Sequence, residues 1–260
     1  MQRKKKIHVG THVILIAGSI IMLFPFFWMV LSSFKTVGEQ MMIPMQILPS
    51  SFKNTENFRQ ALDAVPFLRL YGNTLLMIAG RVLCAVIFSS MAGYGFARMQ
   101  FPFKNLFFGI VLLQMMVPGQ IFIVPQYMML SKINMLNTVF ALVFPALVSA
   151  FGTFLLRQQY MSLPKELEEA AILDGCNPWQ TFIKIMVPIT KSTIASLAIF
   201  TALFAWKDLM WPLIANNDLN HMPLSAGLSV LQGVCHTNKG AMMASSPPTI
   251  RSLWQVPCWP

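Results

Sequence analysis

A charged stretch lies between apolar regions of the chain: residues 157–188 read RQQYMSLPKELEEAAILDGCNPWQTFIKIMVP. Its first half predicts a short helix. Pro164 fits the first turn of a helix because its missing N–H would be unpaired there, and Gly175 supplies the left-handed residue that ends one. Acidic side chains favour the positive end of a helix dipole, and three of them follow the proline: Glu166, Glu168 and Glu169.

The second half of the stretch predicts another short helix. Asn177 is a suitable N-cap, Pro178 occupies the first helical position, and Gln180 stands three residues after the cap, as in a capping box. Pro188 is expected to end this helix, because proline cannot donate a backbone hydrogen bond. The whole stretch therefore predicts a rigid helix–turn–helix rather than a flexible connection.

The rest of the chain has the composition of a membrane protein. Of its 260 residues, 55% are hydrophobic and only 11% are charged, and the mean hydropathy is +0.59. Soluble domains carry about 25% charged residues, so this composition argues against a soluble enzyme. The net charge is +10, but Lys and Arg are thinly spread apart from residues 3–6. The sequence has no stripe of basic and aromatic residues that would indicate nucleic-acid binding. We expect the chain to be surrounded by membrane lipid.

Five segments are long and apolar enough to cross a membrane, which takes about 20 residues. In lipid such runs form helices, because no other local structure satisfies their backbone groups. The sequence therefore predicts an all-α polytopic membrane protein with five transmembrane helices, near residues 13–34, 73–97, 106–130, 137–156 and 189–211. The first segment contains Pro25 and lacks a cleavage site, so we interpret it as an uncleaved anchor.

Lysine and arginine predict the orientation, since they are retained on the cytoplasmic side of a membrane. A cytoplasmic N-terminus places residues 3–6 and the 157–188 loop inside, and the connection 35–71 outside, with more basic residues inside than outside. We expect three parts: a basic N-terminus at 1–12, a transmembrane domain at 13–244 and a C-terminal tail at 245–260. The tail is proline-rich and is not expected to span the membrane.

The spacing of residues in the charged stretch resembles a family signature. Glu169-Ala170-Ala171, three residues, Gly175, nine residues and Ile185-Met186-Val187-Pro188 resemble the E-A-A-x3-G-x9-I-x-L-P pattern of binding-protein-dependent ABC import permeases, with Val187 in place of leucine. Further segments within residues 10–233 resemble the carbohydrate-uptake branch, specifically the maltose-type second permease subunit. They are Asn73-Thr74-Leu75, Ala92 to Arg98 with Phe101-Pro102, Met116-Val117-Pro118, Asn137-Thr138, Leu155 to Gln158, and Trp211-Pro212-Leu213.

The resemblance implies the type I permease fold of ABC importers in a bacterial-type cell (cytoplasmic) membrane. In that family two different six-helix permeases form the pathway, two cytoplasmic ATPase subunits grip the signature loops, and an extracytoplasmic solute-binding protein delivers a carbohydrate. We therefore expect a transport subunit rather than an enzyme, with no cofactor of its own and with ATP bound by the partner subunits. The chain indeed contains no G-x-x-x-x-G-K-[ST] phosphate loop.

The same resemblance assigns ATPase coupling to the charged stretch. Glu169 is expected to pair with a basic residue of the ATPase, Ala170 and Ala171 to form a close-packing face, and Gly175 to fix the bend. Asp174 and Pro188 complete this set. The family pattern fails at residues 245–260, so the sixth helix of the family is missing and we expect a frameshift or truncation there.

Polar residues at membrane depth form a second set of candidates, because they are costly there and are often functional. Arg81 lies inside the second predicted span, about two turns from its outer end. It either extends to the outer interface or lines the pathway facing an anionic group. Trp206 either stacks on a sugar ring or is an interfacial aromatic. The other pathway candidates are Gln114, Asn137 and Asp208.

The cysteines predict neither a disulfide framework nor a metal site, because they have no close pairing and no histidine at metal-ligand spacing. They are Cys84, Cys176, Cys235 and Cys258. Two other functions stay open beside sugar import. One is an ion-coupled carrier or channel, for which only Asp208 supplies a carboxylate near a span. The other is a non-functional truncated membrane scaffold.

Overall fold

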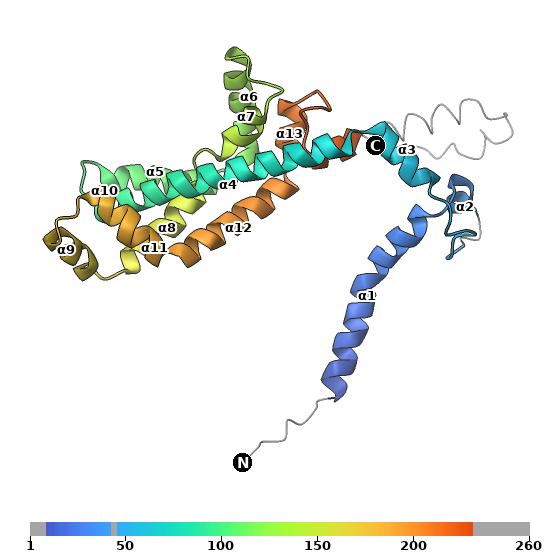
Figure 1. Ribbon diagram of the computed structural model, residues 1–260, viewed down its shortest axis with the longest axis horizontal. Coiled ribbons are helices and arrows are strands. Elements are labelled where there is room, and N and C mark those ends of the chain that lie inside the picture. The colour runs from blue at the N-terminus through green and yellow to red at the C-terminus, as the bar shows by residue number, and fades with distance from the viewer. Residues whose placement is uncertain (1–8, 43–45, 231–260) are drawn as a thin grey trace. The chain divides into compact units, whose positions relative to one another are not determined.

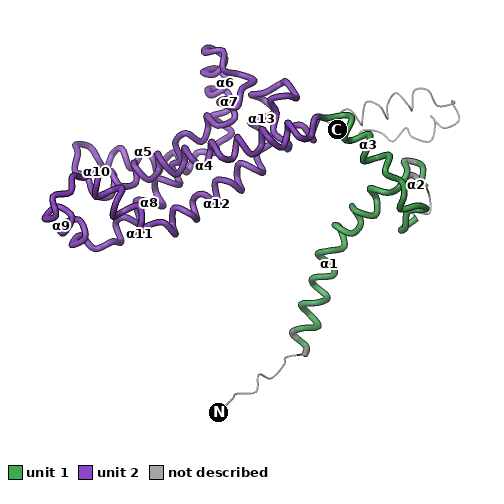
Figure 2. Tube along the Cα trace, viewed as in Figure 1, with its two compact units in different colours: residues 1–65 green, residues 66–260 purple. Residues whose placement is uncertain are grey.

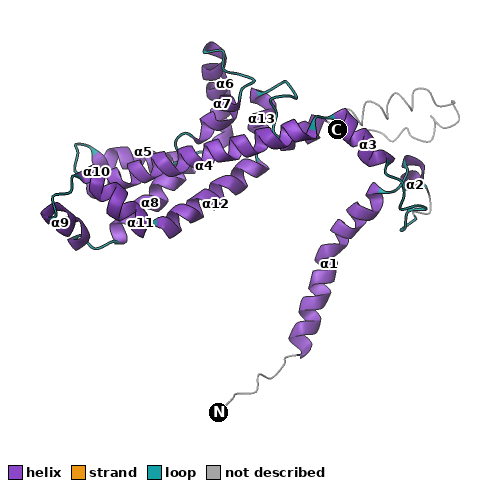
Figure 3. Ribbon diagram, in the orientation of Figure 1, coloured by secondary structure: helices purple, strands orange, loops and turns teal. Residues whose placement is uncertain are grey.

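The computed structural model describes residues 9–42 and 46–230, and all regular secondary structure in these two ranges is helical (Figure 1, Figure 3). The prediction of an all-α protein is thus confirmed. The basic cluster at residues 3–6, the tail at 245–260, Cys235 and Cys258 lie outside the described residues.

The chain divides into two compact units, residues 1–65 and residues 66–260 (Figure 2). The first unit contains α1 (Val9–Ser33), α2 (Val37–Met41) and α3 (Glu56–Ala64). The first predicted span lies in α1, whose residues His12–Ser33 are apolar enough to cross a membrane. α2 begins with a capping box, in which Thr36 and Glu39 each accept the other's backbone N–H.

The second unit is built along one long helix, α4 (Phe67–Arg98), against which α8 (Ala150–Ser162) and α12 (Lys191–Lys207) pack. Glycines allow the close approach of α8 to α4. A Cβ atom added to Gly152 would lie 2.5 Å from Ser89 Oγ, and one added to Gly93 would lie 3.0 Å from Leu156 Cβ. The helices are therefore in direct backbone proximity, as small residues permit in membrane bundles.

The remaining elements of this unit are shorter. They are α5 (Lys104–Met116), η1 (Gly119–Phe122), α6 (Ile123–Lys132), α7 (Val139–Val143), η2 (Phe144–Ala146), α9 (Glu166–Leu173), α10 (Pro178–Thr181), η3 (Phe182–Met186), α11 (Val187–Ile189) and α13 (Met210–Ala215). A buried cluster joins α4, α8, η3 and α12, and consists of Tyr94, Leu156, Tyr160, Phe182, Met186 and Leu197.

Two of the predicted spans are bent helix pairs rather than straight helices, and a third, 189–211, begins at a bend that follows the charged loop. The breaks bend the chain by 102° between Lys104–Met116 and Gly119–Lys132, by 46° between Val139–Ala146 and Ala150–Ser162, and by 76° between Pro178–Ile189 and Lys191–Lys207. Pro118 lies in the first break, where it cannot donate a helical hydrogen bond. By length and composition the described residues therefore offer two unbroken spans, or up to five if each bent pair crosses as one.

Pro188 does not end the second loop helix, contrary to the sequence prediction. The helical run continues from α10 through the π-helix η3 into α11, and the bend comes after Ile189. Proline normally breaks an α-helix by removing an amide and by clashing with the carbonyl four residues earlier. The wider i→i+5 turn of a π-helix directly before Pro188 relieves this conflict.

Candidate functional site

The first half of the charged loop folds as α9, and its end is fixed by Gly175. This glycine has φ +77°, its N–H bonds Ile172 O at 3.0 Å, and the Cys176 N–H bonds Ala171 O at 2.9 Å. These two bonds form a Schellman motif, which satisfies carbonyls that a helix end otherwise leaves free. The predicted left-handed stop is present at the predicted residue.

The second half begins with the predicted capping box. The Gln180 N–H donates to Asn177 Oδ1 at 2.8 Å, and the Asn177 N–H donates to Gln180 Oε1 at 3.0 Å. Pro178 occupies the first turn of α10. Caps at both sides of the turn leave residues 174–177 little freedom, so α9 and α10 form a stiff corner at one end of the second unit (Figure 1).

The residues that were expected to contact the ATPase differ in their exposure to solvent. Glu169, Ala170, Asp174 and Pro188 are exposed. Ala171 is only 2% exposed, and its expected place in a close-packing face for another protein stays a prediction. Its methyl group packs inside the chain, and its carbonyl is an acceptor of the Schellman motif.

The largest apolar exposure on α9 was missed by the sequence analysis. Leu173 is 88% exposed and Ile172 67% exposed, directly before the turn, and Trp179 on α10 is 55% exposed. Ile172 and Leu173 are therefore adjacent apolar side chains that the described part of the chain leaves exposed at a rigid corner. The signal was in the sequence, as an apolar pair between the acidic turn and Gly175.

Arg81 is buried and forms an ion pair with Asp208. Its Nη1 lies 2.8 Å from Asp208 Oδ2, its Nε donates to Leu142 O at 2.7 Å, and the two side chains are 8% and 22% exposed. The guanidinium is thus held by partners within the chain, and its place relative to the outer interface stays a prediction. The sequence placed the helix start at residue 73, but α4 begins at Phe67, which puts Arg81 near the middle of the helix.

The other pathway candidates do not gather around this ion pair. Asn137 has φ +57°, its N–H bonds Ala215 O at 3.1 Å, and its Oδ1 accepts the Asn217 N–H at 2.6 Å, so it holds the segment after α13. Trp206 is 44% exposed and stands edge-on to Tyr71, with ring centroids 6.1 Å apart. Gln114 is exposed and lines a separate cavity of about 460 Å³.

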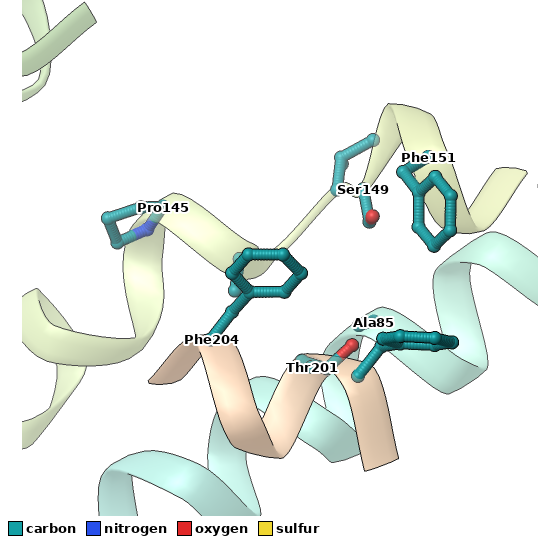
Figure 4. A pocket seen from close by; sticks show the side chains of 9 residues that line it. Ala85, Pro145, Ser149, Phe151, Thr201 and Phe204 are labelled. Carbon is teal, nitrogen blue, oxygen red and sulfur yellow. The ribbon is translucent and has the colours of Figure 1, made fainter. Parts of the chain in front are cut away.

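A second cavity of about 480 Å³ lies between α4, the α7–α8 connection and α12. Figure 4 shows Phe151 and Phe204 among its lining, with the hydroxyls of Ser149 and Thr201 as its polar groups. None of the five pathway candidates lines this cavity. No group of three or more His, Cys, Asp or Glu residues able to hold a metal occurs in the described part of the chain.

Comparison with known proteins agrees with this architecture. A model of the family described as "Binding-protein-dependent transport system inner membrane component" matches residues 85–231. The arabinooligosaccharides transport system permease protein AraQ of Halalkalibacterium halodurans is 32% identical over 237 residues, which are 89% of this chain and 84% of that protein. The sn-glycerol-3-phosphate transport system permease protein UgpE of Salmonella typhi is 28% identical over 246 residues, 92% of this chain and 86% of that protein.

A solved structure shares the fold. It is a bacterial ABC transporter involved in the import of the acidic polysaccharide alginate, and it matches with a TM-score of 0.73 and 20% identity over 85% of this chain and 78% of its own. The match to the family model covers more than half of this chain, and it contains both the charged loop and α12. The chain belongs to the binding-protein-dependent transport system inner membrane components, the permease subunits of ABC importers, which are transport components rather than enzymes.

Proposed function

We propose that this chain is one permease of an ATP-driven carbohydrate importer. It forms half of the translocation pathway together with a different, second permease, and it receives its substrate from an extracytoplasmic solute-binding protein. Relatives named for arabinooligosaccharide and sn-glycerol-3-phosphate transport support a substrate class of oligosaccharides and related polyol phosphates. The N-terminus and the loop 157–188 lie on the cytoplasmic side of the membrane.

The charged loop is the contact with two cytoplasmic ATPase subunits, one on this permease and one on its partner. The observation that carries this proposal is the stiff, capped corner of α9 and α10, with Ile172 and Leu173 exposed at its tip. Glu169 and Asp174 add negative charge beside this apolar tip. A stiff corner transmits a push from the ATPase into the membrane helices, whereas a flexible tether would absorb it.

Capture of the ATPase tests this contact. The chain is co-expressed with its partner permease and a tagged ATPase, and the amount of chain recovered on the tag is measured. Leu173→Ser and Glu169→Lys are expected to reduce recovery about tenfold, since loss of a central interface contact costs about 1.4 kcal/mol or more. Glu166→Lys is the control, because Glu166 is exposed on the same helix but lies outside the tip. Full recovery with Leu173→Ser would contradict the assignment.

Trp206 and Gln114 are the exposed side chains that we assign to the translocation pathway. Arg81 and Asp208 hold α12 on α4 beside it, and Asn137 fixes the segment after α13. Trp206 is 44% exposed and presents an aromatic face of the kind on which sugar rings stack. We expect Trp206→Ala to raise the KM for uptake and Trp206→Phe to keep most of the affinity. Equal KM values for both variants and the native chain would exclude Trp206 from the pathway.

A further inference from the structure

A single arginine joins three helix ends at the base of the charged loop. Arg98 is the last residue of α4. Its Nη2 donates to Leu163 O at 2.6 Å and to Tyr160 O at 2.8 Å, both at the end of α8. Its Nε lies 3.5 Å from Glu168 Oε1, in the first turn of α9.

The contacts of Arg98 are protected from water. The Arg98 side chain is 8% exposed and the Glu168 side chain 20% exposed. Nε and Oε1 are buried and make no hydrogen bond in the described part of the chain, so the contact between them is an ion pair. An ion pair with little solvent is weakly screened, so loss of either member leaves a buried charge without compensation.

The two carbonyls lie at the end of α8, where Tyr160 O also accepts the Leu163 N–H at 3.4 Å. The last four carbonyls of a helix have no partner within it, and a cationic side chain at that end both bonds them and favours the dipole. Glu168 places its charge at the opposite, N-terminal end of α9. The guanidinium of Arg98 therefore caps the end of α8 and also binds the start of α9. Only residues 163–165 separate these two helices.

The two halves of the loop are attached to the membrane helices in different ways. The α10–η3 half is held by apolar packing, since Phe182 lies with its ring centroid 5.1 Å from that of Tyr94 and 6.4 Å from that of Tyr160. α9 has no buried large side chain, and Ala171 is its only buried residue. Loss of the Arg98 contacts should therefore loosen α9 and leave α10 in place.

We propose that Arg98 is a positioning residue that clamps the first helix of the coupling loop to the ends of α4 and α8, so that a displacement of α9 moves both helices together. The part played by the ATPase rests on the function proposed above, but the clamp itself does not. α4 and α8 are in close contact at this end, since a Cβ added to Gly93 would lie 3.0 Å from Leu156 Cβ. Lysine cannot replace the clamp fully, since only the planar guanidinium reaches carbonyls and carboxylate from one rigid fork.

Hydrogen exchange on the purified full chain in lipid nanodiscs tests the clamp without any partner protein. In Arg98→Gln and Glu168→Gln the amides of 170–176 are expected to exchange about tenfold faster, as loss of one charge-assisted contact predicts. The amides of 182–190 should keep their native rates. Glu166→Gln is the matched control, because Glu166 lies in the same turn and is exposed. Unchanged exchange of α9 in both variants would overturn the proposal.

ATP hydrolysis by the assembled importer then tests what the clamp does. In Arg98→Gln, basal hydrolysis and ATPase capture are expected to stay native, while stimulation by the loaded binding protein falls about tenfold. Arg98→Lys should recover part of the stimulation. Native stimulation in a variant whose α9 exchanges faster would overturn the transmission role. If α9 exchanges faster but Leu173→Ser still captures the ATPase, the clamp stands and the proposed ATPase contact fails.

Discussion

The residue at which the charged loop turns is Gly175, with φ +77° and no neighbouring atom within 4 Å of the Cβ that a larger residue would add. Space is therefore available, and backbone conformation alone restricts this position. For an L-residue the left-handed region costs about 1–2 kcal/mol, least for asparagine and most for a β-branched residue. Substitutions at Gly175 thus separate backbone strain from steric overlap.

We predict that Gly175→Val reduces substrate-stimulated ATP hydrolysis in the assembled importer, and that Gly175→Asn retains most of it. Valine strains the Schellman motif by about 1–2 kcal/mol and shifts the direction in which α10 leaves α9. Asparagine adopts the same φ with little strain. The measurement is stimulated against basal hydrolysis in reconstituted vesicles, with membrane abundance as the control. Equal stimulation in the two variants would show that the corner does not need its present angle.

The ion pair of Arg81 and Asp208 gives a second prediction, at the level of two residues. Arg81→Gln and Asp208→Asn each leave a buried charge without its partner, which costs about 3 kcal/mol in a well-buried pair and less here, because Asp208 is 22% exposed. The double variant removes both charges. We expect each single variant to lower the melting temperature of the purified chain, and the double variant to regain part of the loss. Additive losses would mean that the two charges do not stabilise each other.

Helix packing in the second unit depends on which glycines face another helix. Gly152 of α8 has Ser89 Oγ at 2.5 Å and Ser89 Cβ at 2.9 Å from the place of an added Cβ, whereas Gly109 of α5 has no atom within 4 Å. A methyl group at residue 152 therefore forces α8 away from α4. The same change at residue 109 replaces a poor helix former by a good one without new contacts.

We predict opposite effects for the two alanine substitutions. Gly152→Ala should destabilise the chain by about 1–3 kcal/mol, the usual cost of overpacking. Gly109→Ala should leave stability unchanged or raise it by up to about 1 kcal/mol. Thermal unfolding of both variants in the same detergent gives the comparison. A Gly152→Ala chain as stable as the native one would mean that α4 and α8 separate easily.

Short sequence patterns predicted the helix ends of the charged loop, whereas contacts between residues far apart in the sequence could not be predicted. The Asn177–Gln180 capping box and the Gly175 stop depend on residues at most a few positions apart, so the sequence contains them completely. Arg81 and Asp208 are 127 positions apart, and nothing in one chain's sequence pairs them. The π-turn before Pro188 was missed because no short sequence pattern marks it, and its residues Phe182 and Met186 belong to the buried cluster shared with distant helices.

At the scale of the whole second unit, α4 separates two groups of loops. Arg69 Nη1 donates to Asn220 Oδ1 at 2.6 Å, and Asn73 Nδ2 donates to Asn220 O at 2.7 Å, near the start of α4. Arg98 holds the charged loop at its other end. The 32 residues of α4 extend about 48 Å, which exceeds the hydrocarbon thickness of about 30 Å. A membrane crossed by α4 would therefore separate these two groups of loops.

We predict that residue 217 is extracytoplasmic and residue 165 cytoplasmic, since the basic loop stays inside. In a chain whose native cysteines are serines, Asn217→Cys should react with a membrane-impermeant maleimide in intact spheroplasts, and Lys165→Cys only after permeabilisation. Both positions are exposed, so their reaction with the maleimide depends on the side of the membrane on which they lie and not on burial. The reverse labelling pattern would show that the chain has the opposite orientation in the membrane. Equal labelling of both would mean that α4 does not span the bilayer, because its two ends then share one aqueous phase.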